Sequence, residues 1–460
     1  MRALLFFTLL GPAAYASGFY YPDLGAVPLG RGATGAAGAG DLSALHTNPA
    51  GLAELDGLHV QAELSIARQA VSFTRGGICG TGTLSCPTVE NGGGPFLNTV
   101  SGVAFHLGRA SPALAGLVVA LGVYGPPSVG HLQFPDPRTA RGSPQLSAPQ
   151  RYSLINSANF VLYPGLGVGY RALPWLDVGA TVQVRTARLK QARTIFASTI
   201  GGDVAEFDAI ATADATDAAR LAFGIGAIVR PAAGLSVGAS FRPMIPVHAD
   251  GTLDVVAPLA QTAGITVEGN RSKVDLIFPA EARLGVRWAN GPFAAAAEVE
   301  WEGWGALREI VVTPVDIVIK QGGEPTKLGP IQLTKKFHGS FSFRFGGEWS
   351  LPQGWFPQGF GIVSRIGGIY EGSAIPDQAL QVDFPNMARA ALTLGATLRV
   401  GPVGFTLGFA HYFQVDKVVT DSEALRPNPF PSATPFVVGN GNYSSSLDLL
   451  ALQLVWTFGR

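Results

Sequence analysis

The chain has 460 residues and no formal net charge; 14% of its residues are charged, 47% are hydrophobic and 60 are glycines. A soluble surface needs more charge than this, and a nucleic-acid partner would need a basic stripe. The composition therefore argues against a set of soluble domains and against nucleic-acid binding.

The first 16 residues have the pattern of a secretory signal peptide. Arg2 supplies the positive start, residues 3–10 the apolar core, and Ala14-Tyr15-Ala16 an A-x-A cleavage site. The alternative is a short buried helix. No later segment of the sequence has the ~18 unbroken apolar residues that a transmembrane helix requires. We therefore expect an exported chain without a helical anchor.

Past residue 55, apolar and polar residues alternate with a period of two, which is typical of strands with one apolar face. For example, Phe341, Phe343 and Phe345 alternate with Ser342 and Arg344. The pattern predicts fourteen strands, near residues 58–75, 98–109, 114–125, 155–172, 174–192, 218–231, 233–249, 276–290, 293–313, 336–350, 357–372, 387–401, 402–415 and 444–458.

Short and long connections alternate between these strands. The short ones are residues 110–113, 173, 232 and 291–292, and the long ones are 76–97, 126–154, 314–335 and 416–443. Outer-membrane barrels have short periplasmic turns and long outer loops. A soluble sandwich would show the same strand pattern, but the connections and the even strand count favour an all-β, transmembrane antiparallel β-barrel of about 14 strands.

Most tryptophans fall near predicted strand ends or turns, which suits an interfacial aromatic girdle; these are Trp175, Trp288, Trp349, Trp355 and Trp456. The alternative is a set of core tryptophans in a sandwich. Trp301 and Trp304 lie within a predicted strand and do not fit the girdle. Residues 194–219, rich in alanine, are predicted to form a loop that contains a short helix.

Cys79 and Cys86 lie close together in a glycine-rich segment. In an oxidising compartment this spacing predicts a disulfide that closes a small loop. A metal site is the weaker alternative because no further cysteine or histidine lies nearby, and no metal is expected.

Residues 17–55 are predicted to form a small plug inside a barrel that spans residues 56–460. The stretch from Gly30 to Leu55 is rich in small residues, nearly uncharged and too short to fold alone. Residues 30–35 formally match G-x-G-x-x-G, but no strand precedes them, so we reject a dinucleotide site. Seven scattered histidines and the lack of a G-x-S-x-G motif give little support to an enzyme. No cofactor is expected.

The amino-terminal segment resembles the mature amino terminus of the FadL/TodX family of outer-membrane transporters for hydrophobic compounds. The features that carry the resemblance are Gly18-Phe19, Leu29-Gly30-Arg31-Gly32, Asp41 and Asn48-Pro49-Ala50. Weaker likeness continues in residues 163–170, 237–242, 278–280 and 300–302. One departure is that Gly459 and Arg460 follow Phe458, whereas such barrels usually end on an aromatic residue.

The resemblance implies a fourteen-stranded barrel plugged by an amino-terminal hatch. It implies passive uptake of long-chain fatty acids or aromatic hydrocarbons, which outer loops capture and a lumen pocket binds before lateral release into the membrane. The implied partners are a hydrophobic small molecule and outer-membrane lipid, with a monomer in the outer membrane of a Gram-negative cell. A general diffusion porin, a lipolytic enzyme and a surface adhesin remain alternatives.

Five hatch residues are candidates for gating. Gly30 and Gly32 permit close packing and alternative backbone paths. Pro49 fixes its own φ and biases Asn48 towards extended geometry, and Ala50 completes the motif. The alternative is an ordinary Asn-Pro turn.

Four residues are candidates for ligand binding. By the resemblance, Phe19 would border the pocket, although it could equally be a disordered terminal residue. Arg185, Arg242 and Arg344 fall on the polar faces of their strands and suit a carboxylate head group. The alternative is a lumen network of ion pairs with Glu298, Glu300 and Glu302.

Gly122 and Gly125 precede Pro126-Pro127 and predict an interruption in the third strand that would serve as a lateral exit. The alternative is the simple end of that strand.

Overall fold

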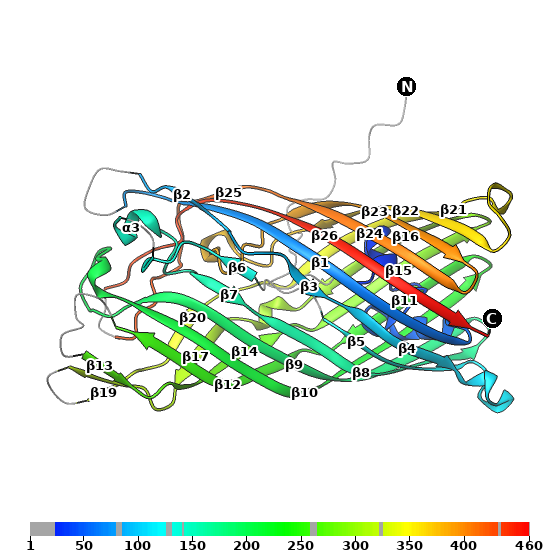
Figure 1. Ribbon diagram of the computed structural model, residues 1–460, viewed down its shortest axis with the longest axis horizontal. Coiled ribbons are helices and arrows are strands. Elements are labelled where there is room, and N and C mark those ends of the chain that lie inside the picture. The colour runs from blue at the N-terminus through cyan, green and yellow to red at the C-terminus, as the bar shows by residue number, and fades with distance from the viewer. Residues whose placement is uncertain are drawn as a thin grey trace, which may run out of the picture.

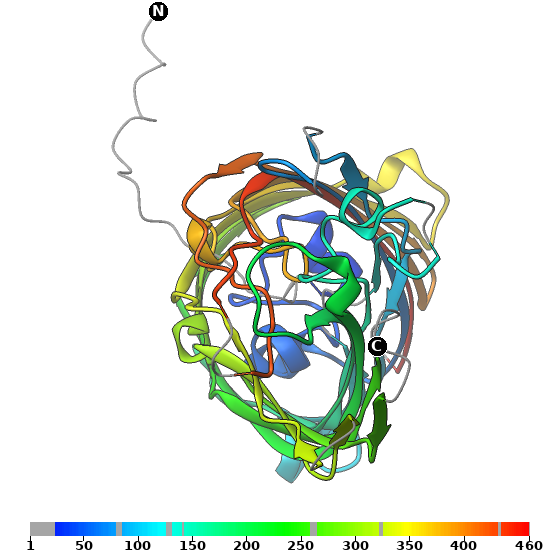
Figure 2. The same ribbon diagram turned by 90° about the vertical axis from the view of Figure 1, so that its left-hand side faces the viewer.

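The computed structural model describes residues 24–79, 85–125, 131–139, 142–257, 265–321, 325–430 and 434–459. They form an elongated, closed antiparallel β-barrel with a small hatch inside one end (Figures 1 and 2). The predicted signal peptide and Phe19 lie outside the described residues.

Fourteen wall strands, some of them in two segments, are present in the described part of the chain. They are β1 (Leu58–Arg75), β3 with β4 (Phe96–Asn98, Val100–His106), β5 (Leu117–Tyr124), β8 (Phe160–Leu173), β9 (Leu176–Phe196), β10 (Asp208–Ala232), β11 with β12 (Leu235–Arg242, Ile245–Val256), β14 with β15 (Arg271–Phe278, Glu281–Asn290), β16 with β17 (Phe293–Glu302, Glu309–Pro314), β21 (Ser340–Ser350), β22 (Phe360–Glu371), β23 (Arg389–Val400), β24 (Val403–Gln414) and β26 (Gly441–Phe458). The predicted fold class is confirmed.

The ring closes where β1 pairs with β26 along its whole length, from Leu58 opposite Phe458 to Arg75 opposite Gly441. Closure removes both sheet edges, so each wall strand has a neighbouring strand on either side. The short turns lie at the end that holds the carboxyl terminus, and the long connections lie at the other end (Figure 1).

The long connections carry short extra elements. They are β2 (Thr88–Glu90), β6 (His131–Gln133), α3 (Pro144–Ser147), β7 (Asn156–Ala158), β20 (Ile331–Thr334) and β25 (Lys417–Val419), and a separate small sheet of β13 (Ile265–Glu268), β18 (Val318–Gln321) and β19 (Thr326–Lys327). Cys79 and Cys86 form a disulfide in the connection after β1. Among the described residues, no helix is both long and apolar enough to cross a membrane.

Side chains alternate between the lumen and the outer surface because successive residues of a strand point to opposite faces. On β23, Leu392, Leu394 and Leu398 are exposed on the outside, whereas Thr393 and Thr397 are buried in the lumen. The predicted girdle tryptophans are all exposed, and Trp304 is fully buried. The outer face is therefore the apolar one, which suits contact with lipid.

The prediction for residues 194–219 is confirmed only for residues 197–207, which form a connection with a short 3-10 turn, and is wrong on either side of them. β9 continues to Phe196, and β10 begins at Asp208 and pairs with it, with only a 3-10 turn at Ala205–Phe207 between them. Alanine favours helix in isolation, but cross-strand pairing overrides that preference once a neighbouring strand is available.

We expect Leu394→Arg to destabilise the barrel by ~2–4 kcal/mol, because it places a charge near the middle of the lipid-facing band of β23. Phe360→Arg, at the end of β22 beside a short turn, should cost only about 0–1 kcal/mol. Denaturant unfolding in lipid vesicles measures both, and equal losses would argue against a lipid-facing outer surface.

Candidate functional site

The hatch lies inside the lumen (Figure 2), at the end with the short turns (Figure 1). It contains α1 (Ala26–Gly30), α2 (Ala44–Thr47) and a 3-10 turn at Pro49–Glu54, and nearly all of its described residues are buried. Elements this short are not stable alone. The hatch therefore depends on its contacts with the wall.

The Asn48 side chain connects two segments of the hatch to each other and to the barrel wall. Its Oδ1 accepts a hydrogen bond from Ala50 N (3.0 Å), which caps the turn that begins at Pro49. Its Nδ2 donates to Ala36 O (2.6 Å) and to Ala227 O of β10 (3.1 Å). Asn48 thus joins two parts of the hatch to each other and to β10, and a role of Asn48, Pro49 and Ala50 in gating stays a prediction.

Inward-facing wall glycines make room for the hatch. A Cβ atom at any of ten positions would approach hatch atoms to between 1.8 and 2.7 Å, closer than packed atoms come. Gly30 and Gly32 of the hatch pack against two of them, Gly395 and Gly367. We call these ten glycines the glycine seat: Gly122, Gly167, Gly169, Gly179, Gly226, Gly238, Gly346, Gly367, Gly395 and Gly408.

Charged wall residues hold the hatch backbone. Glu298 of β16 accepts from Gly35 N (2.7 Å) and Ala36 N (2.8 Å). Arg242 of β11 donates to Leu45 O (2.6 Å) and His46 O (3.1 Å), near the end of α2, where carbonyl groups lack helical partners. Arg242 is thus a contact to the hatch, and its predicted role in ligand binding stays a prediction.

The other two predicted arginines lie apart from Arg242. Arg344 of β21 is fully buried and donates to Glu300 (2.5 Å) and Glu371 (3.3 Å). This contact agrees with the alternative prediction, an ion-pair network in the lumen. Arg185 of β9 is bound to Asp217 of β10 (2.9 Å). The structure thus places the three arginines at three different contacts rather than around one ligand.

The interruption predicted at Gly122 is not present. β5 pairs without a register shift on both sides, with Gly122 opposite Gly102 of β4 and Gly165 of β8. Gly125 follows the end of β5, and its N–H donates to Thr99 O (3.1 Å). A glycine within a paired strand keeps both ladder hydrogen bonds, so its presence alone does not open the wall. A role of these glycines in lateral release stays a prediction.

An apolar pocket lies in the lumen between the hatch and the long connections. Its lining combines β9, β10, β12, β14, β17 and β20 with a covering side chain, Phe384, and includes Leu189, Ile195, Ala211, Leu253, Val274, Leu276, Ile310, Val312, Ile331 and Leu333. The cavity volume is about 60 Å³, enough for a few water molecules and too small for a long alkyl chain. A larger ligand therefore requires side chains such as Phe384 to move.

Two buried cations lie beside this pocket and share one carboxylate. Lys335 Nζ lies 2.7 Å from Asp383 Oδ2, and Arg193 Nη2 lies 3.4 Å from the same atom. Burial lowers the pKa of Lys335, and the neighbouring Asp383 opposes that shift. A buried charge needs a partner, so two cations with one shared anion favour a second anion at this place.

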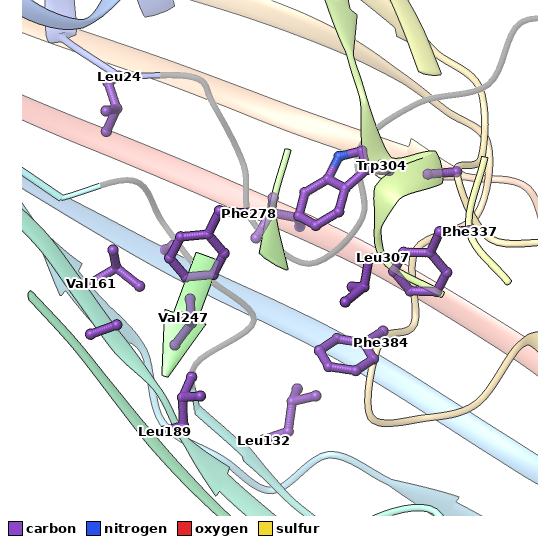
Figure 3. Close-up of a cluster of buried hydrophobic side chains, with 14 of the residues drawn as sticks. Leu24, Leu132, Val161, Leu189, Val247, Phe278, Trp304, Leu307, Phe337 and Phe384 are labelled. Atoms are coloured by element: carbon purple, nitrogen blue, oxygen red, sulfur yellow. The ribbon is translucent and has the colours of Figure 1, made fainter. Parts of the chain in front are cut away.

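Buried apolar side chains extend from the pocket towards the hatch. Figure 3 shows Phe384 and Leu132 on one side, Val247 and Phe278 in the middle, and Leu24 of the hatch segment on the other. Below the hatch, that is, towards the short turns, a cavity of about 290 Å³ has a lining that is more polar than apolar and includes the charged Arg31, Asp41 and Glu348. An apolar molecule thus finds apolar contacts above the hatch and polar ones below it.

Sequence reasoning missed the pair of cations. Arg193 follows the predicted end of its strand at residue 192, and Lys335 falls at the end of a predicted loop. Their meeting depends on long-range folding. The one available signal was the polar alternation of Gln191 and Arg193 on the lumen face, which would have extended the strand.

A closed fourteen-stranded barrel with an apolar outer face and a plugged lumen defines an outer-membrane β-barrel channel. The family model described as outer membrane protein transport protein (OMPP1/FadL/TodX) matches residues 152–458. The chain belongs to this family, whose members are transport channels of the Gram-negative outer membrane and not enzymes.

Solved structures agree on the fold. Similar ones include a Pseudomonas aeruginosa FadL homologue (14% identity, 96% of this chain and 100% of that chain, TM-score 0.73). The toluene transporter TbuX of Ralstonia pickettii is 16% identical, and the match covers 94% of this chain and 98% of that chain with a TM-score of 0.62. The toluene transporter TodX of Pseudomonas putida is 13% identical, and the match covers 96% of this chain and 100% of that chain with a TM-score of 0.63. No match is found among curated proteins.

We expect Gly238→Leu to displace the hatch, because a Cβ there would lie 1.8 Å from Ala36 O. Planar-bilayer recording should then show a larger ion conductance than wild type. Gly404→Leu is the matched control: it also adds a side chain to an inward glycine, but a Cβ at that position has 3.9 Å or more of clearance. An unchanged conductance in Gly238→Leu would mean that the hatch does not block the lumen.

Proposed function

We propose that the protein is a passive transporter that takes up long-chain amphiphiles with an anionic head group. The long connections capture the ligand, the apolar pocket binds its chain, and the hatch prevents passage straight through. The observation that carries the proposal is the apolar pocket beside Arg193 and Lys335, which share Asp383.

The charge at the pocket favours a carboxylate over a neutral hydrocarbon. Arginine and lysine form strong, charge-assisted hydrogen bonds with carboxylates. A neutral aromatic compound, such as the toluene named for two of the similar structures, would occupy the apolar part of the pocket but would leave the two cations with a single anion. Aromatic hydrocarbons are therefore the second candidate ligand class.

The arrangement of the lumen favours lateral release over an aqueous path. The glycine seat packs closely around the hatch, and the cavity below it is polar. An alkyl chain is better solvated by the bilayer than by such a cavity. A general diffusion porin needs a water-filled channel, which a buried hatch opposes. Because the ring closes within one chain, a monomer with outer-membrane lipid around it suffices.

We expect Arg193→Gln and Lys335→Gln each to weaken binding of a long-chain carboxylate about tenfold or more, because each removes a charged hydrogen bond worth ~1.5–3 kcal/mol. Binding of the alcohol with the same chain should change little. Lys336→Gln is the matched control, since Lys336 is an exposed neighbour paired with Glu423. Ligand titration in nanodiscs measures all three variants; equal losses for carboxylate and alcohol would indicate a structural role.

Carboxylate binding should also depend on pH. A lysine with a lowered pKa loses its charge at a lower pH than an exposed lysine, so affinity should be full below the pKa of Lys335 and fall as the pH rises through it. Affinity for the alcohol should stay constant over the same range, and Lys335→Gln should remove the alkaline loss. The same titrations at increasing pH check this, and a parallel loss for the alcohol would contradict it.

A further inference from the structure

Three arginines bind a single carboxylate below the hatch. Arg31, which follows α1 in the hatch, places its Nη1 3.1 Å from Glu348 Oε2 of β21. Arg287 of β15 reaches the same oxygen through Nη2 (2.9 Å), and Arg365 of β22 reaches the other oxygen through Nε (2.8 Å). We call Arg31, Arg287 and Arg365 the arginine cluster. One negative charge thus faces three positive charges.

Ion pairs elsewhere in the lumen have more carboxylates for each arginine. Arg283 lies beside two glutamates, Glu298 and Glu300. Arg344 likewise lies beside Glu300 and Glu371. Because a buried charge needs partners, the excess of positive charge in the arginine cluster favours an additional anion there.

The two wall arginines of the cluster have unused donors. Among the described residues, no group accepts a hydrogen bond from Arg287 Nε, Arg287 Nη1 or Arg365 Nη2. Arg31 differs, because its Nε donates to Thr34 O (3.0 Å) and its Nη2 to Ala39 O (3.2 Å) in addition to the Glu348 contact. Arg31 therefore anchors the hatch, whereas Arg287 and Arg365 can still bind an anion.

The arginine cluster lines the cavity of about 290 Å³ at the end with the short turns. This volume is close to the lower end of the range for small-molecule sites, ~300–1,000 Å³. Two short turns, residues 291–292 and 401–402, also line the cavity and are exposed, so solvent at that end reaches it. The short turns of an outer-membrane barrel face the periplasm.

The lining of this cavity has an excess of positive charge. It contains four arginines, the cluster and Arg399, and two carboxylates, Glu348 and Asp41. Asp41 accepts hydrogen bonds from Ser43 N (2.9 Å) and Gln453 Nε2 (2.6 Å) and forms no ion pair within the described residues. With His59 neutral, the excess of two positive charges favours a ligand with two negative charges.

The arrangement of the donors favours phosphate over a dicarboxylate. The arginine cluster comes from the hatch and from two wall strands and meets at one carboxylate group. A phosphate group gathers about 1.5 to 2 negative charges and three strong acceptor oxygens in one place. A dicarboxylate divides its charge between two ends, so only one end could meet the cluster. Arginine also matches the geometry of phosphate oxygens with paired donors.

We propose that this cavity is a periplasmic binding site for a phosphate group, either the free ion or the monoester of a small molecule, with Arg287 and Arg365 as its donors. The site lies on the opposite side of the hatch from the apolar pocket. It does not depend on the proposed uptake of amphiphiles.

Calorimetric titration of the purified protein in detergent tests the site. Sodium phosphate, glycerol phosphate and succinate are added at neutral pH and constant ionic strength. We expect saturable binding of phosphate at one site per chain and weaker binding of succinate. Tighter binding of glycerol phosphate than of inorganic phosphate would assign the site to a monoester, and the reverse order to the free ion. No saturable binding of either would overturn the site, and equally tight binding of succinate would overturn the choice of phosphate.

Arg287→Gln should weaken phosphate binding about tenfold or more, because it removes a charge together with two unused donors. The hatch should stay in place, since Arg287 forms no hydrogen bond to it among the described residues. Arg109→Gln is the matched control: Arg109 also pairs with one carboxylate, Asp56 (2.9 Å), but lies outside the cavity lining. Equal weakening in both variants would show that phosphate binds only through the overall charge of the protein and would overturn the site.

Glu348→Gln should have the opposite effect and tighten phosphate binding, because it removes the negative charge that competes for the arginine cluster. Glu54→Gln is its control, since Glu54 pairs with Arg230 (2.8 Å) away from the cavity lining and should leave the affinity unchanged. Thermal unfolding shows whether each variant is folded. Weaker phosphate binding by folded Glu348→Gln protein would overturn the proposed arrangement, and if that variant does not fold, the comparison of Arg287→Gln with Arg109→Gln decides.

Discussion

The structure depends on the fact that lipid offers no hydrogen-bond partner to an exposed backbone N–H or C=O group. The wall meets this constraint by closing on itself at β1 and β26. Any departure from the ladder must then be compensated by side chains of the same wall. The hydroxyls of Thr99 and Ser101 do so opposite Glu63, and Asp217 does so by accepting from His248 N where β10 faces β12 without a ladder pair. Interruptions of the wall are therefore places where function can be built without loss of closure.

A closed wall also leaves a lumen that must be filled in layers. The hatch fills the lower layer, and the glycine seat lets backbone approach backbone there. Above it, each of Arg283, Arg344 and Arg389 has at least one glutamate partner. Higher still, Arg193 and Lys335 share one carboxylate. The paired charges stabilise the wall, whereas the two cations that share one carboxylate could bind a second anion, which the proposed ligand would supply.

The wall could be predicted well from the sequence, because each strand faces lipid on one side and the lumen on the other. Apolar and polar residues therefore alternate along it with a period of two. The prediction failed at residues 208–219, where pairing with β9 overrides the preference of alanine for a helix. The site was harder. An arginine on a lumen face has the same sequence pattern whether it binds the hatch, as Arg242 does, or an acidic residue, as Arg344 does. Glycines of the seat likewise cannot be distinguished from turn glycines without the fold.

In the proposed transport, the hatch and the apolar pocket together give uptake a direction that needs no energy source. Transfer of an alkyl chain from water to hydrocarbon is favourable by about 0.8 kcal/mol for each buried CH₂ group. A chain in the apolar pocket would reach hydrocarbon sideways, whereas passage towards the short turns would require it to displace a buried hatch and enter a polar cavity. The head group is the costly part, because a carboxylate loses its hydration when it is buried. Arg193 and Lys335 would lower that cost at the pocket, so the apolar contacts and the charged contacts of the proposed ligand belong to the same site.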